Sequence, residues 1–262
     1  MAVLFESEAL NELRLSSNNL NDNSMEELSS FFYRPNCQLK KIDLSGNKIT
    51  YKGARSLFQG LKQNQFLTHL NLENNVEVGE GELSEIKHFL NTNEHLQTLN
   101  LSNCGIKASH IGDMIEGMHA KSTYNPRSGN NTLKVLNLSD NRIKSEGAVF
   151  LASILENNSN TGLRVLDISK NSIEDEACVT LAKALETNSH LTKLSLKSNF
   201  ICDEGGKAFL DCFQANKNLI KLCLDRNSIK TRYIVQIKEY LVENYNIATQ
   251  KRLPKALEEM EE

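Results

Sequence analysis

The residue types best suited to chemistry in this chain are six cysteines and six histidines. The cysteines include no Cys-x-x-Cys pair, and neither type recurs at the spacing that a metal site or a disulfide framework would need. The sequence also lacks a Gly-x-x-x-x-Gly-Lys-Ser/Thr phosphate loop and a Gly-x-Ser-x-Gly nucleophile turn. We therefore predict a protein that is not an enzyme, with no catalytic residues, no metal site and no cofactor.

Composition and charge narrow the class of partner. The formal net charge of -3 argues against a nucleic-acid-binding surface. No apolar run approaches the roughly 18 residues that a membrane helix needs, and Met1–Leu10 has no signal-peptide pattern. Unpaired cysteines suit a reducing compartment. We expect a cytoplasmic protein that binds neither nucleic acid nor membrane.

A recurring stretch determines where any functional side chain must lie. Residues 133–141 have the pattern Leu-x-x-Leu-x-Leu-x-x-Asn, which predicts a short strand with Leu136 and Leu138 on one face and Asn141 closing the turn. Related stretches begin at Leu10, Leu39, Leu67, Leu96, Leu163, Leu191 and Leu219. Successive first leucines lie 29, 28, 29, 37, 30, 28 and 28 residues apart, which is the signature of a structural repeat.

The second half of each repeat has helical spacing, as in Leu57 and Leu61 or Leu181 and Leu185. The combined pattern resembles the ribonuclease-inhibitor class of leucine-rich repeats, over about residues 10–244. The resemblance implies an α/β fold, a right-handed horseshoe solenoid of about eight strand–turn–helix repeats. Its parallel sheet would line the concave face and its helices the convex face.

Three segments depart from the regular repeat. Residues 1–9 are expected to close a preceding repeat or to form a minimal cap, so the N-terminal edge should be covered by a partner or by missing sequence. The fourth repeat, residues 96–132, is long, and its polar surplus offers Tyr124 and Arg127 as candidates for partner contact. Residues 245–262 are expected to be a charged tail after a last helix ending near Asn244. An altered turn is expected around Glu77, where a polar residue replaces an apolar one.

The side chains of residues between the strand leucines should lie on the concave face. Because these residues differ between repeats, they should determine what that face can bind. By this positional rule, the concave side chains of the fifth and sixth strands are a mixture of apolar and polar residues. Those of the last two strands include several basic residues. The predicted partner-binding residues are Val135, Asn137, Ser139, Val165, Asp167, Lys193, Lys197, Lys221 and Arg226. The basic members predict an acidic contact toward the C-terminal strands.

The leading functional hypothesis is a non-enzymatic protein–protein scaffold, a subunit or fragment of a larger cytoplasmic assembly. Because the family includes tropomodulin-like, immune-sensor and axonemal proteins, the resemblance extends this to a cytoskeletal or ciliary setting. The alternative is a GTPase-activating protein for a Ran-like small GTPase, since Asn141 and Arg142 match by position the family motif Arg-Asn-Arg-Leu-Glu-Asn-Gly, whereas Asp140 and Lys144 depart from it. Ribonuclease inhibition is weakly supported, because cysteine and tryptophan are too few.

Overall fold

The computed structural model describes residues 10–34, 37–62, 64–118, 131–156 and 162–250. Within them, one sheet has eight parallel strands in the order of the sequence. The strands are β1 (Glu12–Arg14), β2 (Lys41–Asp43), β3 (His69–Asn71), β4 (Thr98–Asn100), β5 (Val135–Asn137), β6 (Val165–Asp167), β7 (Lys193–Ser195) and β8 (Lys221–Cys223).

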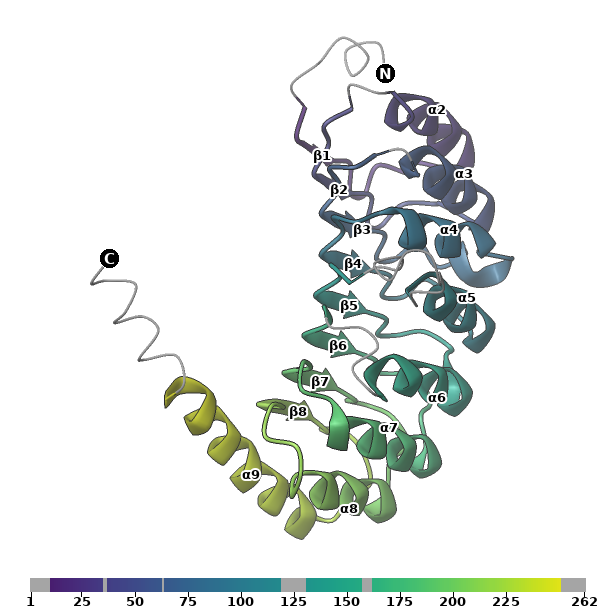
Figure 1. Cartoon of the computed structure of the whole chain (residues 1–262). Coiled ribbons are helices and arrows are strands. Elements are labelled where there is room, and N and C mark those ends of the chain that lie inside the picture. The colour runs from purple at the N-terminus through teal and green to yellow at the C-terminus, as the bar shows by residue number, and fades with distance from the viewer. Residues whose placement is uncertain (1–9, 35–36, 63, 119–130, 157–161, 251–262) are drawn as a thin grey trace, which may run out of the picture.

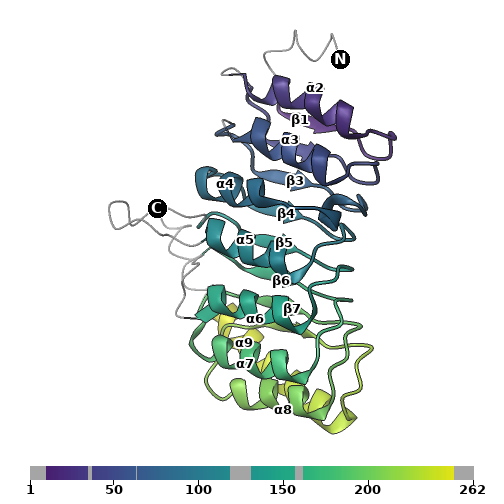
Figure 2. The same cartoon turned by 90° about the vertical axis from the view of Figure 1, so that its right-hand side faces the viewer.

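A helix follows each strand, and the helices stack in the same order. They are α2 (Asp22–Phe32), α3 (Tyr51–Leu61), α4 (Ser84–Thr92), α5 (Ala108–Met118), α6 (Lys144–Leu155), α7 (Asp175–Thr187), α8 (Asp203–Cys212) and α9 (Thr231–Gln250). Figure 1 shows α2 to α8 along one side of a curved stack with the strands along the other, and Figure 2 shows the same helices in front of the sheet. The expected horseshoe solenoid is confirmed.

The core is a continuous column between the sheet and the helices. Strand pairing keeps the middle residues in line from Leu13 through Leu136 to Leu222, so a leucine or isoleucine always stacks on the next one. Leu136 and Leu138 are fully buried, as are the helix leucines Leu57 and Leu181 to within 1%. Because every repeat contributes the same side chains, each repeat buries its apolar side chains against its neighbours, and the fold has no single central core.

Asparagines at the strand ends satisfy the buried backbone of the turns. In the third repeat, Asn75 Nδ2 donates to Leu44 O at 3.0 Å and Leu72 O at 2.8 Å, while its Oδ1 accepts from Ile49 N at 3.1 Å. The same pattern joins one repeat to the next at Asn47, Asn141, Asn171, Asn199 and Asn227. Each side chain replaces the backbone partners that the irregular turn cannot supply.

Aspartates in the first turn of some helices cap the helix that follows. Asp22 Oδ1 accepts from Thr50 N at 2.9 Å and Gly53 N at 3.0 Å. Asp175 Oδ1 accepts in the same way from the backbone of the α8 N-terminus, with Gly205 N at 3.0 Å. A Cβ at Gly53 would lie 2.5 Å from Asp22 Oδ1, which explains the small residue that the repeat carries there.

A second set of buried asparagines guides the chain from each helix into the next strand. Asn216 Oδ1 accepts from Asn218 N at 2.9 Å and Leu219 N at 2.8 Å, and its Nδ2 donates to Leu185 O. The equivalent residues in other repeats are Asn64, Asn93 and Asn188. Asn244 occupies the same place in α9, yet its buried Oδ1 has no partner among the described residues.

The last helix differs from the expectation, because α9 continues to Gln250 rather than ending near Asn244. Earlier repeats carry leucines three, six and eight residues after this asparagine, as in Leu219, Leu222 and Leu224. After Asn244 those positions hold Ile247, Gln250 and Arg252, so no apolar strand draws the chain out of the helix. The backbone amides that would reach Asn244 Oδ1 therefore remain inside α9.

The third repeat has the altered turn that Glu77 predicted. A single 3-10 turn, η1 (Val78–Glu80), places the fully buried Val78 toward the core in place of the glutamate. Gly79 N donates to Cys104 O at 2.7 Å, and a Cβ on Gly79 would lie 2.1 Å from Gly105 O. The glycine is therefore required by the close approach of two backbones.

We predict that Asn216→Ala lowers the free energy of unfolding by about 2–4 kcal/mol, because it leaves several buried backbone groups without partners. Asn244→Ala should cost about 1 kcal/mol, since it also removes an acceptor that is already unsatisfied. Urea denaturation of both variants tests this, with the exposed Asn218→Ala as the control. Equal losses at Asn216 and Asn244 would contradict the unequal roles of the two side chains.

Candidate protein-binding site

Alternation along the short strands gives each one a core side and a concave side. In β5, Leu136 is buried in the core, while Val135 and Asn137 are half-buried on the opposite, concave face. Because the strands are in register, equivalent side chains form rows across the sheet, such as Val135, Val165, Lys193 and Lys221. The structure thus places the predicted strand residues on the face where the leucine spacing put them.

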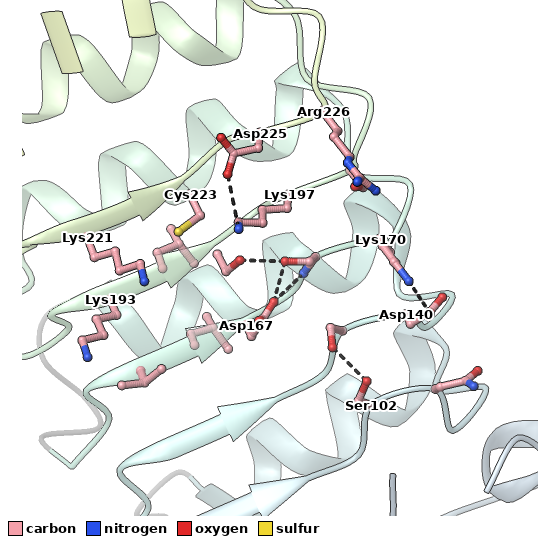
Figure 3. Close-up of a pocket in the computed structure, with 18 of the residues that line it drawn as sticks. Ser102, Asp140, Asp167, Lys170, Lys193, Lys197, Lys221, Cys223, Asp225 and Arg226 are labelled. Carbon is pink, nitrogen blue, oxygen red and sulfur yellow. Dashed lines mark hydrogen bonds and ion pairs between the residues drawn. The ribbon is translucent and has the colours of Figure 1, made fainter. Parts of the chain in front are cut away.

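A hollow of about 660 Å³ lies in the C-terminal half of the concave face. Seven of the nine predicted concave residues line it, namely Ser139, Val165, Asp167, Lys193, Lys197, Lys221 and Arg226. Val135 and Asn137 do not line it, because the hollow reaches the N-terminal strands mainly through their turns, at residues such as Asn74 and Asn103. Figure 3 shows this hollow with Lys193, Lys197 and Lys221 among the side chains that line it.

Sequence reasoning did not select several other residues of the hollow. Asp140 and Lys170 precede a ladder asparagine, where the backbone is left-handed at φ 58° and 54°, and their side chains pair at 2.8 Å. Cys223, Ser195 and Asp225 lie on the concave rows that the positional rule defines, although they were not among the predicted partner-binding residues. The positional rule considered only residues between or directly beside the strand leucines. It therefore missed Asp140 and Lys170, which lie in the turns that bring them beside the strand residues.

The polar side chains in the middle of the hollow are hydrogen-bonded to one another. Asp167 Oδ1 accepts from Ser169 N at 2.9 Å and from Ser169 Oγ at 2.6 Å. Ser169 Oγ in turn lies 2.7 Å from Ser195 Oγ, and Ser102 Oγ lies 2.8 Å from Ser139 Oγ. These bonds hold the side chains in fixed positions, which reduces the entropy lost when a partner binds.

The positive charges of the hollow divide into paired and unpaired groups. Lys197 Nζ lies 3.3 Å from Asp225 Oδ2, so its charge is offset within the protein. Lys193 and Lys221 are exposed, and neither forms an ion pair within the part of the chain that the structure describes. They occupy matched positions on β7 and β8, about 4.8 Å apart along the sheet. Like charges placed side by side repel, and an anionic partner would relieve that repulsion.

The thiols offer no reactive group in the core. Burial raises the pKa of Cys104, Cys178 and Cys212 to about 12, so these side chains stay protonated and unreactive near neutral pH. Cys104 replaces a ladder asparagine, and its thiol donates to Leu72 O at 3.1 Å. Its role is therefore the structural one of closing a turn.

Asn141, the residue behind the GTPase hypothesis, is committed to the fold. Its Nδ2 donates to Leu101 O at 2.8 Å and Leu138 O at 2.9 Å, and its Oδ1 accepts from Cys104 N at 3.0 Å and Ile106 N at 2.9 Å. The adjacent Arg142 pairs with Glu80 at 2.8 Å. A buried and fully bonded amide cannot position water or phosphate, so the GTPase-activating hypothesis loses its central residue.

The remaining candidates fall outside the described residues. Tyr124 and Arg127 lie in segment 119–130, and the proposed cap at 1–9 and the end of the tail at 251–262 are likewise not described. The suggestion that the long fourth repeat contacts a partner therefore stays a prediction. Among the residues that are described, no helix has both the length and the apolarity to cross a bilayer.

The fold and the repeat pattern agree with the family to which the chain is matched. The family model described as Leucine Rich repeat matches residues 7–29, 36–58, 92–109, 129–152, 159–182 and 187–210. The chain belongs to the leucine-rich-repeat family. Fold and concave hollow together define the class of a repeat protein with an open parallel sheet along its concave face.

Particular relatives match part of this chain. NACHT, LRR and PYD domains-containing protein 13 of Homo sapiens is 28% identical over 144 residues, which are 55% of this chain and 13% of that protein. NACHT, LRR and PYD domains-containing protein 3 of Rattus norvegicus is 30% identical over 154 residues, 59% of this chain and 14% of that protein. The chain thus spans a small part of these relatives.

One solved structure has a similar fold. It is described as Leiomodin-1 Actin-Binding Site 2 (ABS2), and the match has a TM-score of 0.51 with 20% sequence identity. It covers 61% of this chain and 87% of the leiomodin chain. At that identity the likeness concerns the fold alone.

We expect Asn141→Ala to lower the free energy of unfolding by about 2–4 kcal/mol, because two buried amides and two buried carbonyls lose their partner. Arg142→Ala should change it little, since Arg142 and Glu80 are both exposed. Chemical denaturation followed by circular dichroism measures both. A loss at Asn141 no larger than that at Arg142 would restore Asn141 as a candidate for a role outside the fold.

Proposed function

We propose that this chain is a non-enzymatic protein-binding scaffold whose concave hollow holds an acidic segment of a partner protein. The observation that carries the proposal is the adjacent pair Lys193 and Lys221, exposed and without an ion pair among the described residues. The two like charges repel each other, and this repulsion does not stabilise the fold. A carboxylate between the two lysines would attract both and offset the repulsion.

Two further features support binding rather than catalysis. The serine and aspartate side chains of the hollow are bonded to one another, which suits a rigid contact surface better than a reactive centre. Membership in the leucine-rich-repeat family adds an open sheet that a partner can reach along its whole length. Val165 in the same hollow offers an apolar contact beside the lysines.

We extend the proposal to a subunit or part of a larger cytoplasmic assembly. All six cysteines are free, and unpaired thiols are typical of proteins kept in a reducing compartment. A cytoskeletal or ciliary setting is the finer form of this proposal. Purification of the tagged chain from its native source with mass spectrometry of bound proteins tests it, and a lone monodisperse monomer would count against an assembly role.

The acidic contact is tested with a fluorescein-labelled ten-residue polyglutamate peptide and fluorescence anisotropy. The wild-type chain should bind it with an affinity that falls as salt rises. The double variant Lys193→Glu with Lys221→Glu should bind at least about tenfold more weakly, because two attractive contacts become repulsive.

The matched control is Lys183→Glu with Lys207→Glu, which makes the same change in net charge at exposed positions of α7 and α8 on the convex side. This control should retain wild-type affinity. Equal losses in both double variants would mean that the peptide responds to overall charge rather than to the hollow, and unchanged binding by the Lys193 and Lys221 variant would overturn the site.

A further inference from the structure

The sheet ends at β8 with a backbone edge that the earlier repeats do not leave open. Leu196 N donates to Cys223 O at 2.8 Å and Ser198 N donates to Asp225 O at 2.9 Å, and equivalent bonds tie each earlier repeat to the next. In the last repeat, Leu224 N and Arg226 N occupy the same two positions. Neither has an acceptor within the ranges that the structure describes. The edge therefore presents two donors at the spacing of a parallel strand.

The side chains of β8 are also less covered than those of the strand before it. Leu222 and Leu224 are 9% and 6% exposed, whereas Leu194 and Leu196 are 1% and 0% exposed. In the interior of the solenoid, the next repeat supplies a leucine or an isoleucine at each of these places. The open edge thus combines backbone donors with an apolar strip.

Helix α9 stands opposite this edge without closing it. Figure 1 shows α9 running from the end of the stack to the concave side, away from β8 at its C-terminal end. A groove of about 350 Å³ separates the two, with Ile220 and Leu222 on the strand side and Ile234 and Leu241 on the helix side. Val242, 60% exposed, lines an adjoining apolar hollow that shares Ile220, Lys238 and Leu241 with the groove.

A helix in this place cannot substitute for a ninth strand. The backbone carbonyls of α9 are used within the helix, so they cannot accept from Leu224 N or Arg226 N. The unpartnered Oδ1 of Asn244 marks the same departure, because the chain passes the point where earlier repeats turn into a strand. Among the described residues, the groove is therefore bounded on one side by a strand edge that has no neighbouring strand.

The positive charge around the groove favours an acidic ligand. Lys221, Arg226 and Lys238 lie along it, and none of the three has an ion pair among the described residues. The one carboxylate in the lining, Asp225, is already paired with Lys197. A segment that enters the groove meets a net positive rim above an apolar floor, which favours carboxylates that alternate with leucine-like residues.

We propose that the β8 edge and the inner face of α9 bind an extended acidic segment of a partner protein as a ninth parallel strand. Its carbonyls accept from Leu224 N and Arg226 N, its apolar residues stack on Leu222 and Leu224, and its carboxylates face Lys221 and Lys238. The inference rests on the proposed scaffold function but uses a surface beside the concave hollow, with only Lys221, Cys223, Asp225 and Arg226 in common.

The probe is the peptide Leu-Glu-Glu-Leu-Glu-Leu-amide with fluorescein on its N-terminal amine, which copies the strand spacing with carboxylates between the leucines. Wild-type chain should bind it, and a peptide of the same composition with shuffled leucines should bind at least about tenfold more weakly, because the stacking register is lost. Amide hydrogen exchange read by NMR should slow about tenfold or more at Leu224 and Arg226 on binding, because both amides would donate to the added strand.

The test variant is Lys238→Glu with Val242→Asp, at two exposed positions of α9. It should lose binding at least about tenfold. Its matched control, Lys183→Glu with Val179→Asp on α7, should not. Circular dichroism melts of both variants establish that each one is folded before binding is measured.

Four results would overturn the inference. These are no binding by the wild-type chain, equal binding by the Lys238 and Val242 variant, binding without protection of Leu224 and Arg226, or protection of both amides in the free protein. The last would mean that another part of this chain, or a second copy detected by sedimentation, already covers the edge. Binding retained in Lys193→Glu separates the groove from the hollow, so either site can fail alone.

Discussion

The structure depends on the need to bond buried backbone groups in turns that are neither helix nor strand. Each strand is three residues long, so about half of a repeat is turn and loop that packs against its neighbours. A buried amide or carbonyl without a partner costs about 1–3 kcal/mol, and a stack of such turns would not be stable. Asparagines such as Asn75, Asn141 and Asn216 meet this need because one amide side chain both donates and accepts across two repeats.

That constraint separates architecture from function. The leucines and the ladder asparagines are the same in almost every repeat, so they carry little information about a ligand. The residues between them differ from one repeat to the next. Lys193 lies on β7 and Lys221 on β8, and Asp167 with its serine partners lies at the centre of the hollow. A partner at this face would meet a rigid polar surface on which Lys193, Lys221 and Arg226 have no ion pair among the described residues.

The C-terminal end shows what happens when the repeat stops before its bonding pattern is complete. The turn that should follow Asn244 has no apolar strand to lead into, and the helix continues instead. Within the part of the chain that the structure describes, the consequences appear together: Asn244 Oδ1 and the amides of Leu224 and Arg226 have no partner, and a groove lies beside α9. In a linear fold the defects of the last repeat cannot be absorbed by a shared core, so they collect at the end.

The sequence by itself determined the repeat number, the strand register and the concave side of each strand, because these follow from local leucine spacing repeated every 28 or so residues. It also located Lys193 and Lys221, and the altered turn at Glu77. Only the tertiary structure decided that Asp225 neutralises Lys197, that Asp140 and Lys170 join the hollow, and that α9 extends to Gln250. Those outcomes depend on contacts between residues from different repeats, which no local period encodes.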